Sequence, residues 1–480
     1  MSAPASPPSQ TPASGGRPAA IATSPALGLP FRNSAPSREV IAELFRVQRG
    51  TDPIGMRIHE ALAIACVFLA GWPTTYVELS YGPLLFCAAV RLTGHVRVPG
   101  PLLWDRVVQL LLGWIAFLFI SKGWSPGSWH DWLIDFWMLR FALVIPALYM
   151  VMDRRPVLIL ALVLGIACGE LSQLAHAAGI GFHISSLDWH RMPGRVSGWW
   201  DPVVGGSILC AGLGLHLSGF ALGASVRERV IGAAGIGVTL ACILATGTRG
   251  AWIGATLLMA IALGIAASRL KPRTRLIRLA LVAAVLLAVA GGAAWFSAGP
   301  QIRQRIEQGR VEVSRAMTVG DYDTDTGMRI GMWRWAWMEF SQHPIIGVGA
   351  GGYKAWADRR LELERLPARA AQSATLPPEP RTHAHSLYVH ALAITGLFGL
   401  GLLLGMILRA IAGGLRDPDS HRRLTGYAAG PALALIGLLC AGLFDTIQVN
   451  QQTANLIYIL VAMCLPSRPP VSSEPWRAAR

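Results

Sequence analysis

Long apolar runs recur along the chain between Glu60 and Leu465. A run of about 20 apolar residues lets a helix cross a bilayer, and in lipid only helices and closed barrels satisfy their own backbone hydrogen bonds. Hydrophobic residues make up 53% of the 480 residues and charged residues 14%. The pattern therefore predicts an all-α polytopic membrane protein, although length alone would suggest two or three soluble domains.

The apolar runs divide into about 12 predicted transmembrane helices. Several are short for a perpendicular span, so their boundaries are approximate. The predicted spans cover residues 60–78, 80–93, 107–121, 135–152, 156–175, 203–221, 229–246, 251–268, 277–296, 387–409, 427–445 and 453–466.

Basic residues gather in alternate connections between these spans, and the positive-inside rule assigns those connections to the cytoplasm. The same rule explains the excess of 42 Lys and Arg over 27 Asp and Glu, so no nucleic-acid partner is expected. This orientation places the N-terminus in the cytoplasm and the long hydrophilic insert 297–384 on the opposite side. Loops of that length are uncommon unless they are functional.

The chain is accordingly divided into two tails, two groups of spans and one loop domain. The start is rich in Pro, Ala, Ser and Gly, which favours disorder, and no apolar segment of a cleavable signal follows Met1. The predicted parts are a disordered cytoplasmic tail (1–57), transmembrane helices one to nine (58–296), a periplasmic loop domain (297–385), transmembrane helices ten to twelve (386–466) and a cytoplasmic tail (467–480).

Cofactor and metal motifs are not expected to contribute. The seven cysteines lie in apolar stretches without zinc-type spacing, so neither disulfides nor structural zinc are expected. The run Gly347–Gly352 formally matches GxGxxG, but no βαβ unit surrounds it, so it is interpreted as a turn between two loop helices. We expect no cofactor and no metal.

His385 stands where the hydrophilic insert meets an apolar helix. An ionisable side chain at a membrane border is a candidate for function, although a histidine there can also be structural. Ser386 is followed by nine residues and then by Gly396 and Gly399, which would let a neighbouring helix approach closely. His383 is a second candidate with less support from its position.

Arg195 and Arg249 lie on the same predicted side of the membrane as His385. Guanidinium groups bind phosphate bidentately, but arginines at this level can also extend to lipid headgroups. Arg329 is a further candidate, or part of an interfacial helix predicted from the spacing of Met328, Met332 and Trp335. Asp445 could pair with one of these arginines or be structural.

A base and cationic groups without a metal suit transfer from an activated, phosphate-linked donor. At this point the chain resembles the superfamily of O-antigen ligases, Wzy-type polymerases and bacterial protein O-oligosaccharyltransferases. The segments that carry the resemblance are H-S-x9-G-x-x-G at His385–Gly399, TGTRGAW at 246–252, WMEFSQHPIIGVGAGGY at 337–353 and GRVSGWWDP at 194–202. Asp201-Pro202 stands where the family usually has Asn-Pro.

The resemblance is closest to O-antigen ligase. It implies a GT-C-like, multi-pass glycosyltransferase of the bacterial inner membrane with its active site facing the periplasm. The implied donor is a glycan on undecaprenyl diphosphate, and the implied acceptor is lipid A-core or another glycan. By the same resemblance His385 matches the catalytic histidine, and Arg195 and Arg249 match the arginines that hold the diphosphate.

The alternatives within the family are an O-antigen or exopolysaccharide polymerase and a protein O-oligosaccharyltransferase. The alternative from another class is a transporter of an anionic lipid-linked glycan, which would also need arginines near a central cavity. Internal repeats would favour the transporter, whereas the large one-sided insert favours an enzyme.

Overall fold

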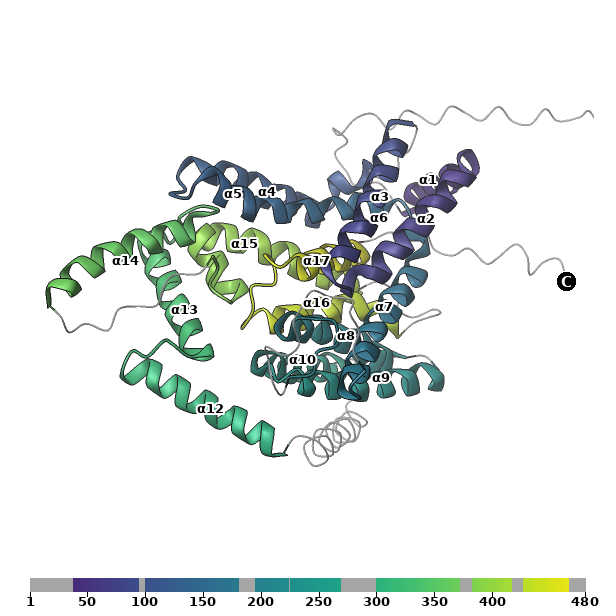
Figure 1. Cartoon of the computed structure of the whole chain (residues 1–480). Coiled ribbons are helices and arrows are strands. Elements are labelled where there is room, and N and C mark those ends of the chain that lie inside the picture. The colour runs from purple at the N-terminus through teal and green to yellow at the C-terminus, as the bar shows by residue number, and fades with distance from the viewer. Residues whose placement is uncertain are drawn as a thin grey trace, which may run out of the picture. The chain divides into compact units, whose positions relative to one another are not determined.

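The computed structural model describes residues 38–94, 100–180, 195–223, 225–268, 299–371, 382–416 and 426–465. All of them belong to one compact unit, Pro36–Arg480. Within these ranges every regular element is a helix (Figure 1). The all-α class predicted from the apolar runs is therefore confirmed for the described part of the chain.

The helices fall into four groups along the chain. The first group is α1 (Arg38–Thr51), α2 (Pro53–Phe68), α3 (Thr74–Gly94), α4 (Arg106–Ile120), α5 (Trp129–Trp137), α6 (Val144–Tyr149) and α7 (Arg155–Ala177). The central group is α8 (Pro202–Leu222), α9 (Val226–Ala245) and α10 (Arg249–Ser268). The insert forms α12 (Gly299–Thr318), α13 (Asp325–Gln342) and α14 (Gly352–Ala371), and α15 (Leu387–Arg416), α16 (Gly430–Ala441) and α17 (Gln451–Cys464) follow it.

Seven helical segments of the described residues are long and apolar enough to cross a membrane. They are Pro53–Gly71, Arg106–Gly123, Trp129–Tyr149, Met152–Ala177, Pro202–Leu222, Val226–Ala245 and Leu387–Arg416, and Arg249–Ile265 and Tyr427–Ala441 are shorter apolar helices. The predicted span 277–296 lies outside the described residues, and the other predicted spans fall on helical segments, although 60–78 crosses the break between α2 and α3 and 135–152 covers parts of α5 and α6. The prediction of about 12 spans thus exceeds the number that meets these criteria, partly because α16, with 12 residues, is only about 18 Å long.

The predicted disordered tail, 1–57, extends too far along the chain. The structure has α1 at Arg38–Thr51, and α2 begins at Pro53. The sequence REVIAELFRVQRGT has apolar residues at helical spacing, and Phe45 and Gln48 are buried. The Pro-rich composition that indicated disorder lies upstream, outside the described residues.

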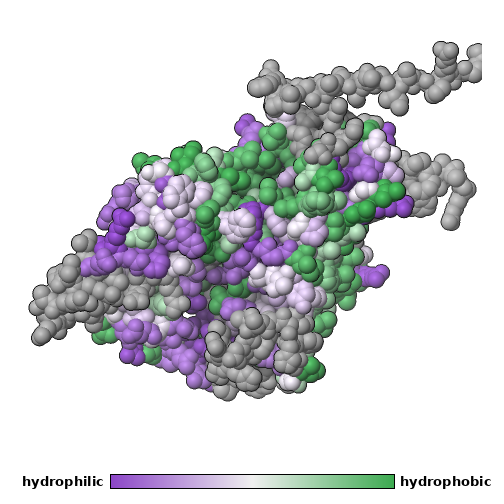
Figure 2. Space-filling view, turned by 45° about the horizontal axis from the view of Figure 1, so that its top comes forward, coloured by the Kyte–Doolittle hydropathy of each residue, from purple (hydrophilic) through white to green (hydrophobic). Residues whose placement is uncertain are grey.

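Helix α8 forms the centre of the bundle. Most of its side chains are buried, and it packs against α9 and α16. A β-carbon on Gly214 would lie 2.4 Å from the carbonyl oxygen of Leu433 in α16, so glycine is required for this close packing. Exposed apolar side chains lie instead on the outer helices, and Figure 2 shows hydrophobic residues covering a broad area of the surface.

The connections meet at two opposite ends of the bundle. At one end, Trp200 Nε1 donates to the Gly71 carbonyl and Val196 N donates to the Ala245 carbonyl. At the other end, Arg155 Nη2 donates to the Ala428 carbonyl. The ends of α2 and α9 thus lie near the segment before α8, and the starts of α7 and α16 lie near each other. Which end faces the cytoplasm remains a prediction.

We expect a cysteine at position 314 to react with a membrane-impermeant thiol reagent in intact cells whose outer membrane is permeabilised. Ser314 is exposed on α12, in the insert predicted to lie outside the cytoplasm. Arg227→Cys is the matched control, since Arg227 is exposed in the first turn of α9 at the opposite end. The parent protein corrects for its native thiols. Labelling of position 314 only after lysis would contradict the predicted orientation.

Helices α12, α13 and α14 lie on one side of the spanning helices in Figure 1, and α13 packs against α15. Met332 and Trp335 of α13 are buried in a second hydrophobic core with Tyr353 and Ala393. The prediction of an interfacial helix from their spacing is therefore wrong, because these side chains fill a protein core. Trp337, on the same helix, is instead 62% exposed.

Helix α15 is broken at Gly396, which has φ 62° and ψ −165°. The turn between α13 and α14 packs into this break. Leu397 N donates to the Pro344 carbonyl, and Val348 N donates to the Ala393 carbonyl, both at 2.9 Å. The predicted turn at Gly347–Gly352 is confirmed, since Gly347, Gly349 and Gly351 all have positive φ. This contact fixes the insert against the helix that follows His385.

Candidate functional site

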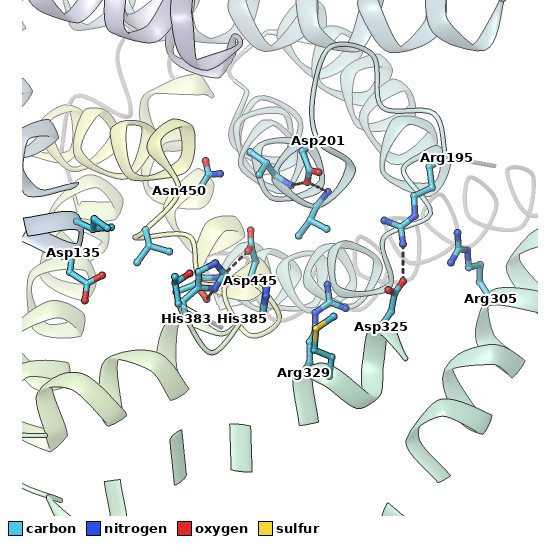
Figure 3. Close-up of a pocket in the computed structure, with 17 residues that line it drawn as sticks. Asp135, Arg195, Asp201, Arg305, Asp325, Arg329, His383, His385, Asp445 and Asn450 are labelled. Atoms are coloured by element: carbon cyan, nitrogen blue, oxygen red, sulfur yellow. Dashed lines mark hydrogen bonds and ion pairs between the residues drawn. The ribbon is translucent and has the colours of Figure 1, made fainter. Parts of the chain in front are cut away.

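A cavity of about 900 Å³ opens at the end of the bundle where the insert is attached (Figure 3). Its wall combines the start of α8, α13 and the segments before α15 and α17. Arg195, Arg329, His383, His385 and Asp445 all line it. The structure thus brings together five of the six residues singled out in the sequence.

His385 is held in a left-handed backbone conformation, with φ 51°. Among the described residues it is the one non-glycine residue with positive φ, and such a conformation costs about 1–3 kcal/mol. The following residues are fixed, because Leu387 N donates to the carbonyls of Gly442 and Asp445 at 2.8 and 3.0 Å. The strain therefore coincides with the residue that presents an imidazole to the cavity, as strained residues at functional sites often do.

His383 lies directly beside His385. The centroids of the two rings are 4.3 Å apart, and the ring planes meet at 64° in an edge-to-face arrangement. The Nδ1 of His383 is 3.2 Å from the Thr446 hydroxyl, an interaction whose direction depends on the tautomer. Thr446 can therefore select the tautomer of His383, and His383 can in turn orient its neighbour.

Arg195 reaches the cavity from the segment before α8. Its side chain crosses Gly247, where a β-carbon would lie 3.3 Å from Cγ of Arg195. Val196 N donates to the Ala245 carbonyl at 2.9 Å, which ties this segment to the end of α9. Arg195 Nη2 lies 3.6 Å from Asp325 Oδ2 (Figure 3). Burial, together with nearby Arg305, lowers the pKa of Arg195.

Arg329 is the arginine of α13 that faces the cavity. Burial lowers its pKa, while Asp325 and Asp445 act in the opposite direction. Its buried Nε has no hydrogen-bond partner. A guanidinium that lines a cavity is suited to bind an anionic group there.

Arg249 does not form part of the cavity wall. Its Nη2 donates to Glu312 Oε2 at 2.8 Å and to the Thr326 hydroxyl at 2.9 Å, and its Nη1 donates to the Arg305 carbonyl at 3.1 Å. Arg249 therefore links α10 to α12 and α13. The contact of Arg249 with the diphosphate, expected from the family resemblance, stays a prediction.

Glu312 is the acidic partner in this link. Although burial opposes ionisation, hydrogen bonds from Thr326 and Arg249 hold the pKa of Glu312 below its usual value. Gly309, one turn earlier in α12, packs closely on Arg249, since a β-carbon there would lie 2.7 Å from Nη1. The charged pair and the glycine together fix α12 against the end of α10.

Asp445 faces the cavity between α16 and α17. Burial raises its pKa to about 6, and Asp201 acts in the same direction, whereas the Ser207 hydroxyl, the Thr446 N–H and Arg329 lower it. Ser207 Oγ lies 3.1 Å from Asp445 Oδ2. Asp445 is therefore hydrogen-bonded to Ser207 and Thr446, and its pairing with an arginine stays a prediction.

Several cavity residues were not singled out in the sequence: Asp135, Arg305, Asp325, Asn450 and Thr446. One of them carried a signal, because Asp135 is an acidic residue at the first position of the predicted span 135–152, and acidic residues in apolar spans are often functional. Arg305 and Asp325 lie in a hydrophilic insert with many charges, where composition does not distinguish them.

Asp201 has a structural role at the start of α8. Its Oδ1 accepts hydrogen bonds from Val203 N and Val204 N, at 2.9 and 3.2 Å, and Pro202 occupies the first turn. Asparagine is an equally good N-terminal cap. The difference from the Asn-Pro of the family is therefore compatible with the same helix start.

The fold and the cavity define a class: a helical membrane protein with imidazoles and guanidinium groups around one cavity at the end of its bundle. Residues 234–404 match the family model Wzy_C, described as O-antigen ligase. This match confirms the family resemblance for a segment that includes Arg249, the insert, His385 and the break in α15. No curated protein matches the chain.

Proposed function

We propose that this protein is an O-antigen ligase of the bacterial inner membrane. It transfers a glycan from undecaprenyl diphosphate to lipid A-core at a site facing the periplasm. The observation that carries the proposal is that His385, Arg195 and Arg329 line one cavity, within or beside the segment that matches the O-antigen ligase model. The arrangement supplies a base and an anion-binding group for a single transfer step.

In the proposed step, the imidazole of His385 accepts the proton of the acceptor hydroxyl while that oxygen attacks the anomeric carbon of the donor. The bond between this carbon and the diphosphate oxygen breaks, and the electron pair leaves with the diphosphate. Arg195 and Arg329, with Arg305 nearby, stabilise the negative charge that develops on the leaving group. A single displacement inverts the anomeric configuration.

The experiment is complementation of a strain that lacks its own ligase, with the lipopolysaccharide ladder as readout. The wild-type protein should restore the ladder without an added cofactor. Longer free polymer without a ladder would identify a polymerase, and glycosylated protein would identify a protein O-oligosaccharyltransferase. Loss of donor from the periplasmic face without any glycosylated product would identify a transporter.

The donor should bind more tightly as the pH falls through about 6. Asp445 is ionised above its pKa of about 6 and offsets the charge of Arg329. Below that pH the carboxyl group is neutral, so the cavity is more cationic. Asp445→Asn should therefore tighten binding at pH 8 by about fivefold and weaken the pH dependence between 5 and 8.

The measurement is equilibrium binding of an undecaprenyl-diphosphate-linked glycan, a diester whose own charge does not change in this range. The Asn variant isolates the contribution of the Asp445 carboxyl group from that of the other groups in the cavity. Equal affinities of Asp445→Asn and wild type at pH 8 would show that Asp445 does not modulate the anion site.

A further inference from the structure

Polar groups of different kinds occupy the two ends of the cavity. In Figure 3, Arg195, Arg305 and Asp325 lie on one side of the histidines and Asp135 lies on the other, while Asn450 lies above the histidines, away from these arginines. The first end has guanidinium groups suited to phosphate. The second end has a carboxyl group and a carboxamide, and among the described residues that line the cavity no arginine or lysine lies there.

Asp135 is part of the apolar segment Trp129–Tyr149, which is long enough to cross a membrane. A carboxyl group inside such a segment is costly and usually functional. Gly351 N donates to Asp135 Oδ2 at 2.7 Å, and this hydrogen bond fixes the side chain against the turn of the insert. One oxygen is thereby positioned by the protein, and Oδ1 can accept a hydrogen bond from a ligand in the cavity.

Asn450 offers the complementary group. Its Oδ1 caps α17 by accepting hydrogen bonds from Gln452 N and Thr453 N, at 3.0 and 3.4 Å. The cap fixes the carboxamide, so its NH₂ group is the part that can donate to a ligand. The Thr382 hydroxyl and the apolar side chains of Ile134 and Val449 line the same cavity.

The direction from which the nucleophile attacks determines which substrate occupies each end of the cavity. In an inverting displacement the nucleophile attacks from the face opposite the leaving group. If the diphosphate occupies the arginine end, the acceptor must approach from the other side of the histidines. That side is the end with Asp135 and Asn450.

We propose that Asp135 and Asn450 form the acceptor subsite and that it takes a sugar with adjacent free hydroxyl groups. This inference rests on the proposed function, whose acceptor it defines. The Asp135 carboxylate oxygen can accept a hydrogen bond, the Asn450 NH₂ can donate one, and the Thr382 hydroxyl can do either. Together these groups match several hydroxyls of a pyranose, whereas a serine side chain has only one hydroxyl. The apolar neighbours suit the C–H face of the ring. The subsite therefore favours a glycan acceptor over a protein acceptor.

The test uses the purified full-length protein in lipid nanodiscs, with an undecaprenyl-diphosphate-linked glycan as donor and lipid A-core as acceptor. Asp135→Asn keeps an oxygen for Gly351 N and replaces the other with NH₂. Asn450→Asp keeps the oxygen that caps α17 and removes the NH₂ donor. Asp358→Asn is the control, because Asp358 pairs with Lys354 away from the cavity.

Asp135→Asn and Asn450→Asp should each raise the acceptor concentration for half-maximal rate about tenfold, because each loses a hydrogen bond to the sugar. The half-saturating donor concentration should stay within about twofold of wild type. Arg329→Ala should show the opposite pattern. The assignment would be overturned if Asp135→Asn changed the half-saturating donor concentration, or if it changed neither the donor nor the acceptor concentration at half-maximal rate.

Binding of free core oligosaccharide, measured without donor, separates this inference from the proposed function. Binding by wild type that is lost in Asp135→Asn supports the subsite even if no transfer occurs, in which case the ligase proposal fails alone. Transfer by wild type with unchanged acceptor kinetics in both variants rejects the subsite and leaves the ligase proposal intact. Neither binding nor transfer by wild type rejects both.

Discussion

Replacing His385 with asparagine should abolish detectable glycan transfer while the protein remains folded and inserted. Asparagine tolerates the left-handed backbone that His385 adopts at φ 51°, but its carboxamide cannot accept the proton of the acceptor hydroxyl. General-base catalysis typically contributes about 10²- to 10⁴-fold. The measurement is the lipopolysaccharide ladder in a ligase-deficient strain, followed by transfer rates of the purified variant.

His383→Ala is the matched control for this prediction. His383 contacts the ring of His385 and the Thr446 hydroxyl, so its loss should reduce the rate less than the loss of His385. Both variants should be present at the wild-type level and elute as the wild type does on size exclusion. Full complementation by His385→Asn would exclude a role as base. A larger loss of transfer rate in His383→Ala than in His385→Asn would identify His383 as the base.

The helical fold could be predicted because each span carries its own signal, a run of apolar residues about as long as a bilayer is thick. The same signal does not determine how a span is interrupted. Gly396 breaks α15 because the turn at Pro344 packs against it, and this contact joins residues about 50 positions apart in sequence. Burial of Met332 and Trp335 likewise depends on tertiary packing, which helical spacing alone does not distinguish from an interfacial face.

The candidate site was predictable where a residue stood at an unusual place in the pattern. His385 lies at the border of an apolar run, and Arg195 lies in a glycine-containing segment just before one. Arg305 and Asp325 lie among the many charges of the insert, and only the arrangement of α12 and α13 brings them to the cavity. The interaction of Arg249 with Glu312, 63 positions apart, is likewise a property of the folded insert.

Arg249→Ala should reduce transfer by about 10²-fold or more, because the loss of one partner leaves the other charge of a partly buried pair uncompensated. We expect this loss because Arg249 positions the insert: its hydrogen bonds hold α12 and α13 against the end of α10. These two helices carry the cavity residues Arg305, Asp325 and Arg329. Arg249→Lys should restore activity only in part, because one ammonium group cannot reproduce the planar fork that reaches Glu312, Thr326 and the Arg305 carbonyl.

A double-mutant cycle with Glu312 distinguishes this role from direct binding of the diphosphate. If Arg249 acts through Glu312, Glu312→Gln should itself reduce transfer, and Arg249→Ala combined with Glu312→Gln should lose little more than Arg249→Ala alone. If Arg249 binds phosphate directly, removing the charge of Glu312 would free the guanidinium and leave donor binding unchanged or tighter. Donor affinity and transfer rate should therefore be measured for all four proteins. Additive losses, or tighter donor binding in Glu312→Gln, would assign Arg249 to the diphosphate, whereas strong non-additivity identifies the link that aligns the insert over the cavity.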